Sequence, residues 1–371
     1  MIRISAFSST ILFRCEVLLR EAGFWGVLRR FIGKISEIRS IFDIFVFDML
    51  TGIAICMDVE CMSAFKILNM NKIAVKIFRG LIVVLSKLPL KFHYFMGDIF
   101  SWLLKKVFRY RYSVVLTNVA RSFPTNGYAE PRRIVDGFYK HLGEVAAEAI
   151  WFSHSSHRRV MKKGLVRITN AEVLVDYFRK SPSLTVLNTH CGNWEILGGI
   201  FAYLDSTGLD HQITQENVRV VYKKLSSPVS DEVFKRNRIS PLNKDQDTCV
   251  IESSNILRYA ISHKNEKKMY VYPADQSPYR GTGRHFIGEF MNQQTNAMQG
   301  SMGVACKLSH AVLYCKMKRV KRGQYDMTLI PMADDASKTT PDELLRKYYD
   351  LLEEEIRETP SNWLWSHKRW K

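Results

Sequence analysis

Short apolar runs alternate with amphipathic segments along the second half of the chain. The apolar runs are rich in β-branched and aromatic residues and are bounded by polar or turn-forming residues, which predicts buried strands. These runs cover residues 184–187, 218–222, 269–272, 312–317 and 327–330. Helices are predicted between most of them, at residues 194–203, 255–262 and 296–308. Alternation of this kind is typical of an α/β fold with a mixed, mostly parallel central sheet flanked by helices.

Two further helices have clear sequence signals. Residues 130–152 place apolar side chains at helical spacing along one side. The last helix has a start signal, because Thr340 can act as N-cap, Pro341 takes the first helical position and Glu343 can complete a capping box. The pattern therefore predicts helices both before the α/β core and at its C-terminal end.

The chain divides into three predicted parts. Residues 1–69 form an atypical extension, since its apolar stretch contains aspartates that are costly in lipid, and its start lacks the order of a secretory signal. Residues 70–163 form a helical lead-in that we expect to associate with a membrane. Residues 164–371 form the α/β core.

The membrane-associating segment has two apolar pieces. Residues 73–90 carry three basic residues around an apolar run that ends near Pro89, and residues 92–104 follow with Trp102 and a basic run after it. Long basic side chains can reach the headgroups while the apolar residues enter the bilayer surface. We expect an anchor that dips into one leaflet, or a short tilted span. The alternative is an amphipathic helix pair packed on the core.

The charge balance narrows the choice of partners. Lysine and arginine number 54 against 36 acidic residues, a net charge of +18, which indicates an anionic partner. No helix-turn-helix, zinc spacing or RNA-binding motif presents this charge to nucleic acid. An anionic membrane surface or an acidic carrier protein fits better. The seven scattered cysteines predict neither a disulfide framework nor a metal site, which suits a reducing cytoplasm.

One motif concentrates the candidate chemistry. Residues 188–195 read N-T-H-C-G-N-W-E and place His190 and Glu195 on either side of a strand-to-helix turn. We expect Glu195 to hydrogen-bond one imidazole nitrogen and leave the other to accept a proton from a hydroxyl group. Two alternatives stay open. His190 can be purely structural, or Cys191 can act as a nucleophile beside it.

This motif resembles a block of the late (lauroyl or myristoyl type) lipid A biosynthesis acyltransferases, a branch of the lysophospholipid acyltransferase superfamily. The resemblance extends over about residues 70–371. It includes four further sets of residues: Asn118 with residues 122–124, residues 221–223, Asp275-Gln276 with Thr295 and Gly300, and the closing Trp363, Trp365, His367, Arg369 and Trp370. Because members of this family begin close to position 70, we interpret Met70 as the natural start and residues 1–69 as untranslated or poorly ordered.

The resemblance implies roles for individual residues. It makes His190 the general base and Glu195 the residue that orients it. Lys223, where the family has arginine, and its neighbour Lys224 are implied to bind phosphate or pantetheine, although both can be solvated surface charges. Asp275 is implied to be a polar substrate-binding residue, or else a structural turn residue. Backbone N–H groups around Asn193 are candidates for stabilising the oxyanion.

Two other blocks have less defined roles. Thr295 and Gly300 are expected to cap or pack rather than to catalyse. The closing aromatic and basic residues form either an interfacial patch or a packed terminal strand.

The expected function is acyl transfer from an acyl carrier protein thioester to a hydroxyl group of a lipid A precursor, at the cytoplasmic face of the bacterial inner membrane. No cofactor is expected besides the acyl carrier protein co-substrate. Anionic membrane lipids are expected partners, and nucleic acid is not. Alternatives are another acceptor, such as an ornithine lipid or a glycolipid, a thioesterase in which water replaces the acceptor, and a non-catalytic lipid-binding membrane protein.

Overall fold

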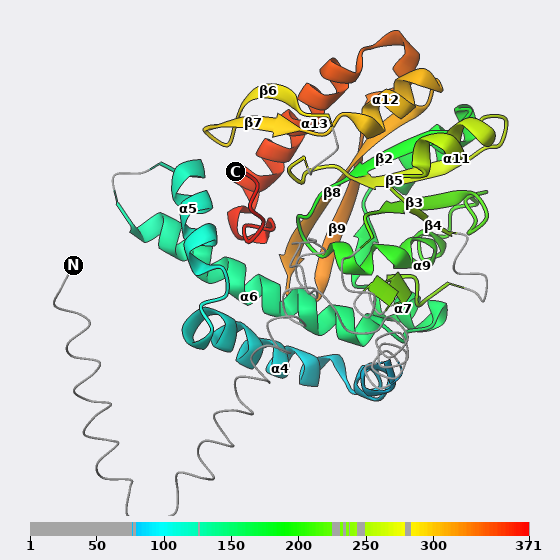
Figure 1. Ribbon diagram of the computed structural model, residues 1–371. Coiled ribbons are helices and arrows are strands. Elements are labelled where there is room, and N and C mark those ends of the chain that lie inside the picture. The colour runs from blue at the N-terminus through cyan, green and yellow to red at the C-terminus, as the bar shows by residue number, and fades with distance from the viewer. Residues whose placement is uncertain are drawn as a thin grey trace, which may run out of the picture. The chain divides into compact units, whose positions relative to one another are not determined.

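The computed structural model describes most of the chain from residue 79 onward (Figure 1). The described residues are 76, 79–124, 127–224, 231–232, 235–236, 238–242, 249–278 and 283–370. The predicted N-terminal extension, residues 1–69, lies outside them, as does most of the run from 70 to 78.

A seven-stranded sheet forms the centre of the fold, in the order β1-β9-β8-β2-β5-β3-β4. Every pair of neighbours is parallel except β8 and β9, which are antiparallel. The strands are β1 Val166–Ile168, β2 Leu184–Asn188, β3 Val218–Tyr222, β4 Val250–Glu252, β5 Met269–Pro273, β8 Ala311–Lys321 and β9 Gln324–Ala333. The predicted mixed, mostly parallel sheet is therefore confirmed.

Helices cover both faces of this sheet. On one face α8 (Ala171–Lys180) and α9 (Ile200–Asp205) pack against Val186 and its neighbours in the main hydrophobic core. On the other face lie α11 (Ile256–Ser262), α12 (Gly300–Lys307) and α13 (Pro341–Glu358), as Figure 1 shows for α12 and α13. The predicted capping box of α13 is present, with the Glu343 amide bound to Thr340 Oγ1.

Two predicted helices differ from the structure. The segment after the motif begins as a 3₁₀-helix, Trp194–Gly199, and becomes α-helical only in α9. The expected helix over 296–308 begins later, at Gly300, because residues before it form a hairpin of β6 (His285–Phe290) and β7 (Gln293–Ala297). The sequence of β7, Q-Q-T-N-A, lacks the apolar alternation that marks a strand.

The helical lead-in packs directly on the core region. Helix α4 (Leu90–Trp102) lies along α6 (Ala129–Phe152), and a Cβ atom on Gly97 would approach the Gly143 carbonyl oxygen to 2.6 Å. Only glycine therefore allows this close crossing. A π-helix (Leu103–Val107), α5 (Tyr112–Ser122) and α7 (His157–Lys163) complete this region. Among the described residues, no helix combines the length and the apolar character that a bilayer crossing needs.

Candidate functional site

The candidate site lies where two neighbouring parallel strands end. Strands β2 and β5 pair in register up to Asn188 and Pro273. The chain continues two residues further to His190 on one strand and to Asp275 on the other. Because the carboxyl ends of parallel strands meet at the same edge of a sheet, this register brings the two side chains together.

His190 and Asp275 form a close pair. The His190 Nδ1 and Asp275 Oδ1 atoms are 2.6 Å apart, and the His190 backbone N–H donates to Asp275 Oδ2 over 2.9 Å. The Trp363 Nε1–H group donates to the same Oδ2 atom over 2.9 Å. Asp275 is only 2% exposed, and burial alone would raise its pKa. The neighbouring imidazole and the three hydrogen bonds reverse this effect and lower the pKa to about 2, so the group is a carboxylate at neutral pH.

This pairing fixes which nitrogen of a neutral imidazole carries the hydrogen. A carboxylate only accepts hydrogen bonds, so Nδ1 donates to Asp275 and the lone pair of the neutral ring is on Nε2. The Gln276 side-chain amide lies 3.1 Å from Nε2 and can donate to it. Trp194 packs edge-on against the ring, with the two ring centres 5.2 Å apart. His190, Trp194 and Gln276 all help to line one cavity.

The predicted hydrogen bond between Glu195 and His190 is wrong. Asn193 caps the 3₁₀-helix by accepting the Glu195 backbone N–H, and the Glu195 carboxylate turns to Arg238. Both carboxylate oxygens accept from Arg238 over 2.8 Å, and Trp194 Nε1 donates to one of them over 2.9 Å. Asp275 therefore takes the orienting position that we predicted for Glu195. The substrate-binding role predicted for Asp275 does not fit, because its oxygens are occupied and it is buried.

The Asn193 side chain is fully buried and has a structural role, whereas the oxyanion role of its backbone N–H stays a prediction. Its Nδ2 donates to Glu148 Oε2 over 2.6 Å, and Tyr94 on α4 donates to the other oxygen over 2.8 Å. The preceding Gly192 has φ +60° and its N–H donates to the Asn362 carbonyl over 3.1 Å, so that N–H is not free for an oxyanion. Helices α4 and α6 thus hold this turn in place through Tyr94 and Glu148.

Cys191 is unsuited to nucleophilic attack. Its side chain is buried, and burial raises the pKa of the thiol well above the ordinary value. A thiol in this state holds little of the thiolate that reacts. The alternative of a cysteine nucleophile is therefore disfavoured by the surroundings of this residue.

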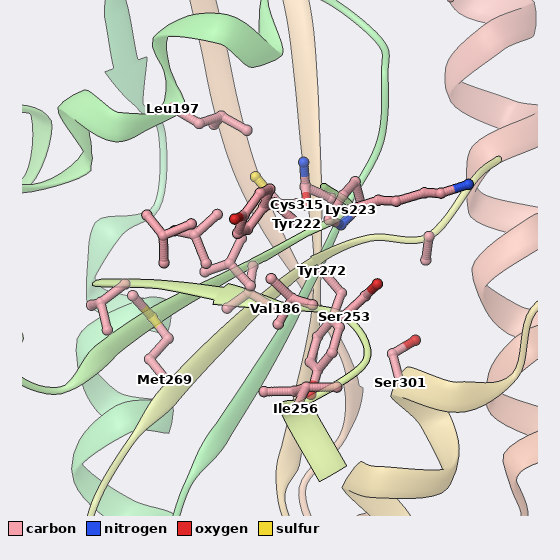
Figure 2. A pocket seen from close by; sticks show the side chains of 18 of the residues that line it. Val186, Leu197, Tyr222, Lys223, Ser253, Ile256, Met269, Tyr272, Ser301 and Cys315 are labelled. Carbon is pink, nitrogen blue, oxygen red and sulfur yellow. The ribbon is translucent and has the colours of Figure 1, made fainter. Parts of the chain in front are cut away.

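A cavity of about 730 Å³ is lined by His190 and by residues from both faces of the sheet, several of which Figure 2 labels. We call the part on one sheet face the α8–α9 arm. Its lining residues include Leu174, Val186, Leu197, Phe201, Met269 and Met327. We call the part on the opposite face, beside helices α11 and α12, the α11–α12 arm. Its lining residues include Val221, Tyr272, Ile256, Leu257, Gly303 and Val304. Among the predicted lysines, Lys223 lines the cavity, whereas Lys224 is exposed outside it.

The closing residues 363–370, which we call the strap, pack against the site. Residues 191 and 363 pair as an antiparallel bridge, which places Trp363 over Asp275. His367 Nε2 accepts the Ser277 N–H over 3.1 Å, and Asn118 Nδ2 donates to two strap carbonyls over 2.9 Å. The strap is therefore a packed terminal segment.

Arg369 and Trp370 extend these contacts to the hairpin. Arg369 donates to the Asn296 carbonyl, and Trp370 donates to Thr295 Oγ1 over 2.8 Å. Sequence reasoning missed the role of Trp363 and of Gln276. Their only sequence signals were the closing tryptophan motif and the Asp-Gln pair.

Glu355 of α13 is buried behind the strand end that carries His190. It accepts hydrogen bonds from Tyr314 Oη over 2.5 Å and from the Met317 N–H over 2.8 Å. Burial raises its pKa to about 7, against the opposing effect of these donors. Between these two pKa values the folded protein thus keeps a proton that the unfolded chain, with the ordinary pKa of 4.5, has already released.

This raised pKa predicts a pH-dependent stability. The folded state binds the Glu355 proton more tightly than the unfolded state does, and this contributes to the free energy of unfolding. The contribution is fully present below about pH 4.5 and is lost as the pH rises through 7. Glu355→Gln removes it. Between pH 5 and pH 8 the free energy of unfolding of the variant should gain about 2–3 kcal/mol relative to the wild type. Denaturant unfolding at both pH values measures the difference.

A matched control lies on the same helix. Glu358 is exposed, and its pKa is lowered by the Lys316 ammonium. Glu358→Gln should therefore show no such gain between pH 5 and pH 8. An equal pH dependence in wild type and Glu355→Gln would show that Glu355 is ionised throughout.

The fold and the site together define a class of protein, an α/β protein with a carboxylate-held imidazole that lines a largely apolar cavity. The family profile of the bacterial lipid A biosynthesis acyltransferases matches residues 64–371, and the chain belongs to that family. Membership supports lipid A acyltransferase activity in general. None of the curated proteins compared with the chain matches it.

Proposed function

We propose that the protein is a late acyltransferase that moves a fatty acyl chain from acyl carrier protein to a hydroxyl group of a lipid A precursor. The observation that carries this proposal is the His190–Asp275 pair at the mouth of the cavity. His190 is the general base, and Asp275 is the residue that orients it. Glu195 acts indirectly. Its carboxylate holds Arg238, and Arg238 lines the cavity.

The proposed reaction needs no covalent enzyme intermediate, because the thioester donor is already activated. His190 Nε2 takes the proton of the acceptor hydroxyl as its oxygen attacks the thioester carbonyl carbon. The tetrahedral intermediate then collapses and the carbon–sulfur bond breaks. The imidazolium returns the proton to the leaving thiolate, while the Asp275 carboxylate stabilises the imidazolium between the two steps.

The α8–α9 arm suits the donor chain. Its lining is apolar, and Val186, Met269 and Leu174 belong to the main core. Each methylene group moved from water into such surroundings contributes about 0.8 kcal/mol. The arm therefore supports binding of a long acyl chain with its thioester beside His190.

The basic character of the chain supports an acidic carrier as donor. The net charge is +18, and Lys223 and Lys235 line the cavity. A lysine ammonium can bind the phosphate of a carrier-bound pantetheine, although without the two-pronged geometry of arginine.

The exposed side of α4 supports attachment at the cytoplasmic face of the inner membrane. Phe95 is 62% exposed and Trp102 is 57% exposed, and both lie on this helix. Lys91, Lys106 and Arg109 are exposed on and just beyond it. A helix with large apolar side chains flanked by cations binds anionic bilayer surfaces.

The acceptor is tested in cells that lack the gene. Loss of one secondary acyl chain from lipid A, restored by the wild-type gene, is the expected result by mass spectrometry of extracted lipids. Unchanged lipid A beside a missing aminolipid or glycolipid would replace the proposed acceptor. Purified protein, acyl carrier protein thioester and lipid A precursor should then reproduce the lost product.

A further inference from the structure

The α11–α12 arm lies on the opposite face of the sheet from the proposed donor arm. In a β-strand, neighbouring side chains point to opposite faces. Val220 and Val271 pair in register and face α8 and α9, so Val221 and Tyr272 face α11 and α12. Figure 2 shows Tyr272, Ile256 and Ser301 grouped beside α12, away from Leu197 and Met269. Both arms meet at the edge of the sheet where His190 lies.

The α11–α12 arm contains a polar group without a partner. Tyr272 is 6% exposed and lines the cavity, and its hydroxyl has no hydrogen-bond partner among the described residues. A buried hydroxyl left in this state costs free energy, so a ligand with an oxygen atom at this place would stabilise it. The aliphatic residues around it, Ile256 and Val304, suit a hydrocarbon chain.

The outer part of this arm is open. Leu257 is exposed, and Lys307 lines the cavity and is exposed as well. On α12, a Cβ atom added to Gly303 would meet no atom within 4 Å, so space remains along this helix. An amphiphile could enter from solvent or from a bilayer surface, with its chain inside the arm and an anionic headgroup near Lys307.

We propose that the α11–α12 arm seats an acyl chain of the acceptor, one that carries an oxygen function. This inference rests on the proposed function, because an acyloxyacyl product forms only when the attacking hydroxyl belongs to an acyl chain. The two chains then lie on opposite faces of the sheet and meet beside His190. The Tyr272 hydroxyl donates to an oxygen of the acceptor chain.

The test fills the arm without weakening the helix. Gly303→Leu projects a side chain into the free space, and leucine favours a helix more than glycine does, so the variant should fold. With wild-type protein as reference, we expect the KM for a precursor that carries 3-hydroxyacyl chains to rise at least tenfold. The KM for acyl carrier protein thioester should stay within twofold. The variant should also prefer precursors with shorter hydroxyacyl chains.

Two further variants complete the experiment. Cys306→Leu introduces the same side chain on α12 at a position that does not line the cavity, and it should behave as wild type. Tyr272→Phe should raise the acceptor KM alone. A changed donor KM or donor chain preference in Gly303→Leu would assign the arm to the donor, and unchanged kinetics would show that it binds neither chain. If wild-type protein transfers nothing to the precursor, the proposed function itself fails. That result is distinct from both outcomes for Gly303→Leu.

Discussion

His190→Ala is expected to abolish almost all acyl transfer. A positioned general base typically contributes about 10²–10⁴-fold to a reaction rate, and here Nε2 is the unprotonated nitrogen at the cavity wall. We expect kcat to fall by roughly this factor while the affinity for the acyl carrier protein thioester is retained. Steady-state transfer from this donor to a lipid A precursor measures both quantities. His154→Ala, at an exposed position, is the matched control and should keep the wild-type rate.

The same variant separates the alternative functions. An unchanged rate or an unchanged effect in cells would make His190 structural and favour a non-catalytic lipid-binding protein. Release of free fatty acid by the wild type without an acceptor product, lost in the variant, would identify a thioesterase.

Asp275→Asn is expected to lower kcat nearly as much as His190→Ala does, although it replaces only one oxygen by an NH₂ group. Asp275 Oδ2 accepts from two N–H groups, of His190 and Trp363, and Oδ1 accepts from Nδ1. Asparagine keeps one oxygen, which the two donors hold, so its NH₂ group faces Nδ1. The imidazole must then take the other tautomer, with the hydrogen on Nε2. We expect kcat to fall by about 10²–10⁴-fold with the fold intact.

The tautomer itself provides a decisive readout. Nitrogen NMR of histidine-labelled protein should place the hydrogen on Nδ1 in the wild type and on Nε2 in Asp275→Asn. Glu195→Gln is the control, because its partner is Arg238. Whatever that change does to the rate, Nδ1 should stay protonated. A tautomer that changes in Glu195→Gln and not in Asp275→Asn would return the orienting role to Glu195.

Local patterns predicted much of the fold. Apolar runs located five strands of the sheet, and the Thr340–Glu343 signal located the start of α13, because both depend on interactions between residues close in sequence. Parallel pairing also brought Asp275 to the same sheet edge as His190. The polar hairpin strand β7 gave no such signal, since only part of it is buried.

The partner of His190 was harder to predict for a physical reason. Glu195 is near in sequence, yet the Asn193 cap and the tight 3₁₀-turn direct its carboxylate to Arg238. Trp363 completes the pair from 88 residues beyond Asp275, through a contact that only tertiary packing creates. The resemblance singled out the blocks that contain these residues, but it did not reveal which residues within them touch.

The strap also has a consequence for residues outside the cavity. Asn118 of α5 does not line the cavity, yet its side chain donates to two strap carbonyls. The same strap carries Trp363, which donates to the Asp275 oxygen that also accepts the His190 N–H. The position of the imidazole therefore depends on a helix that does not touch it.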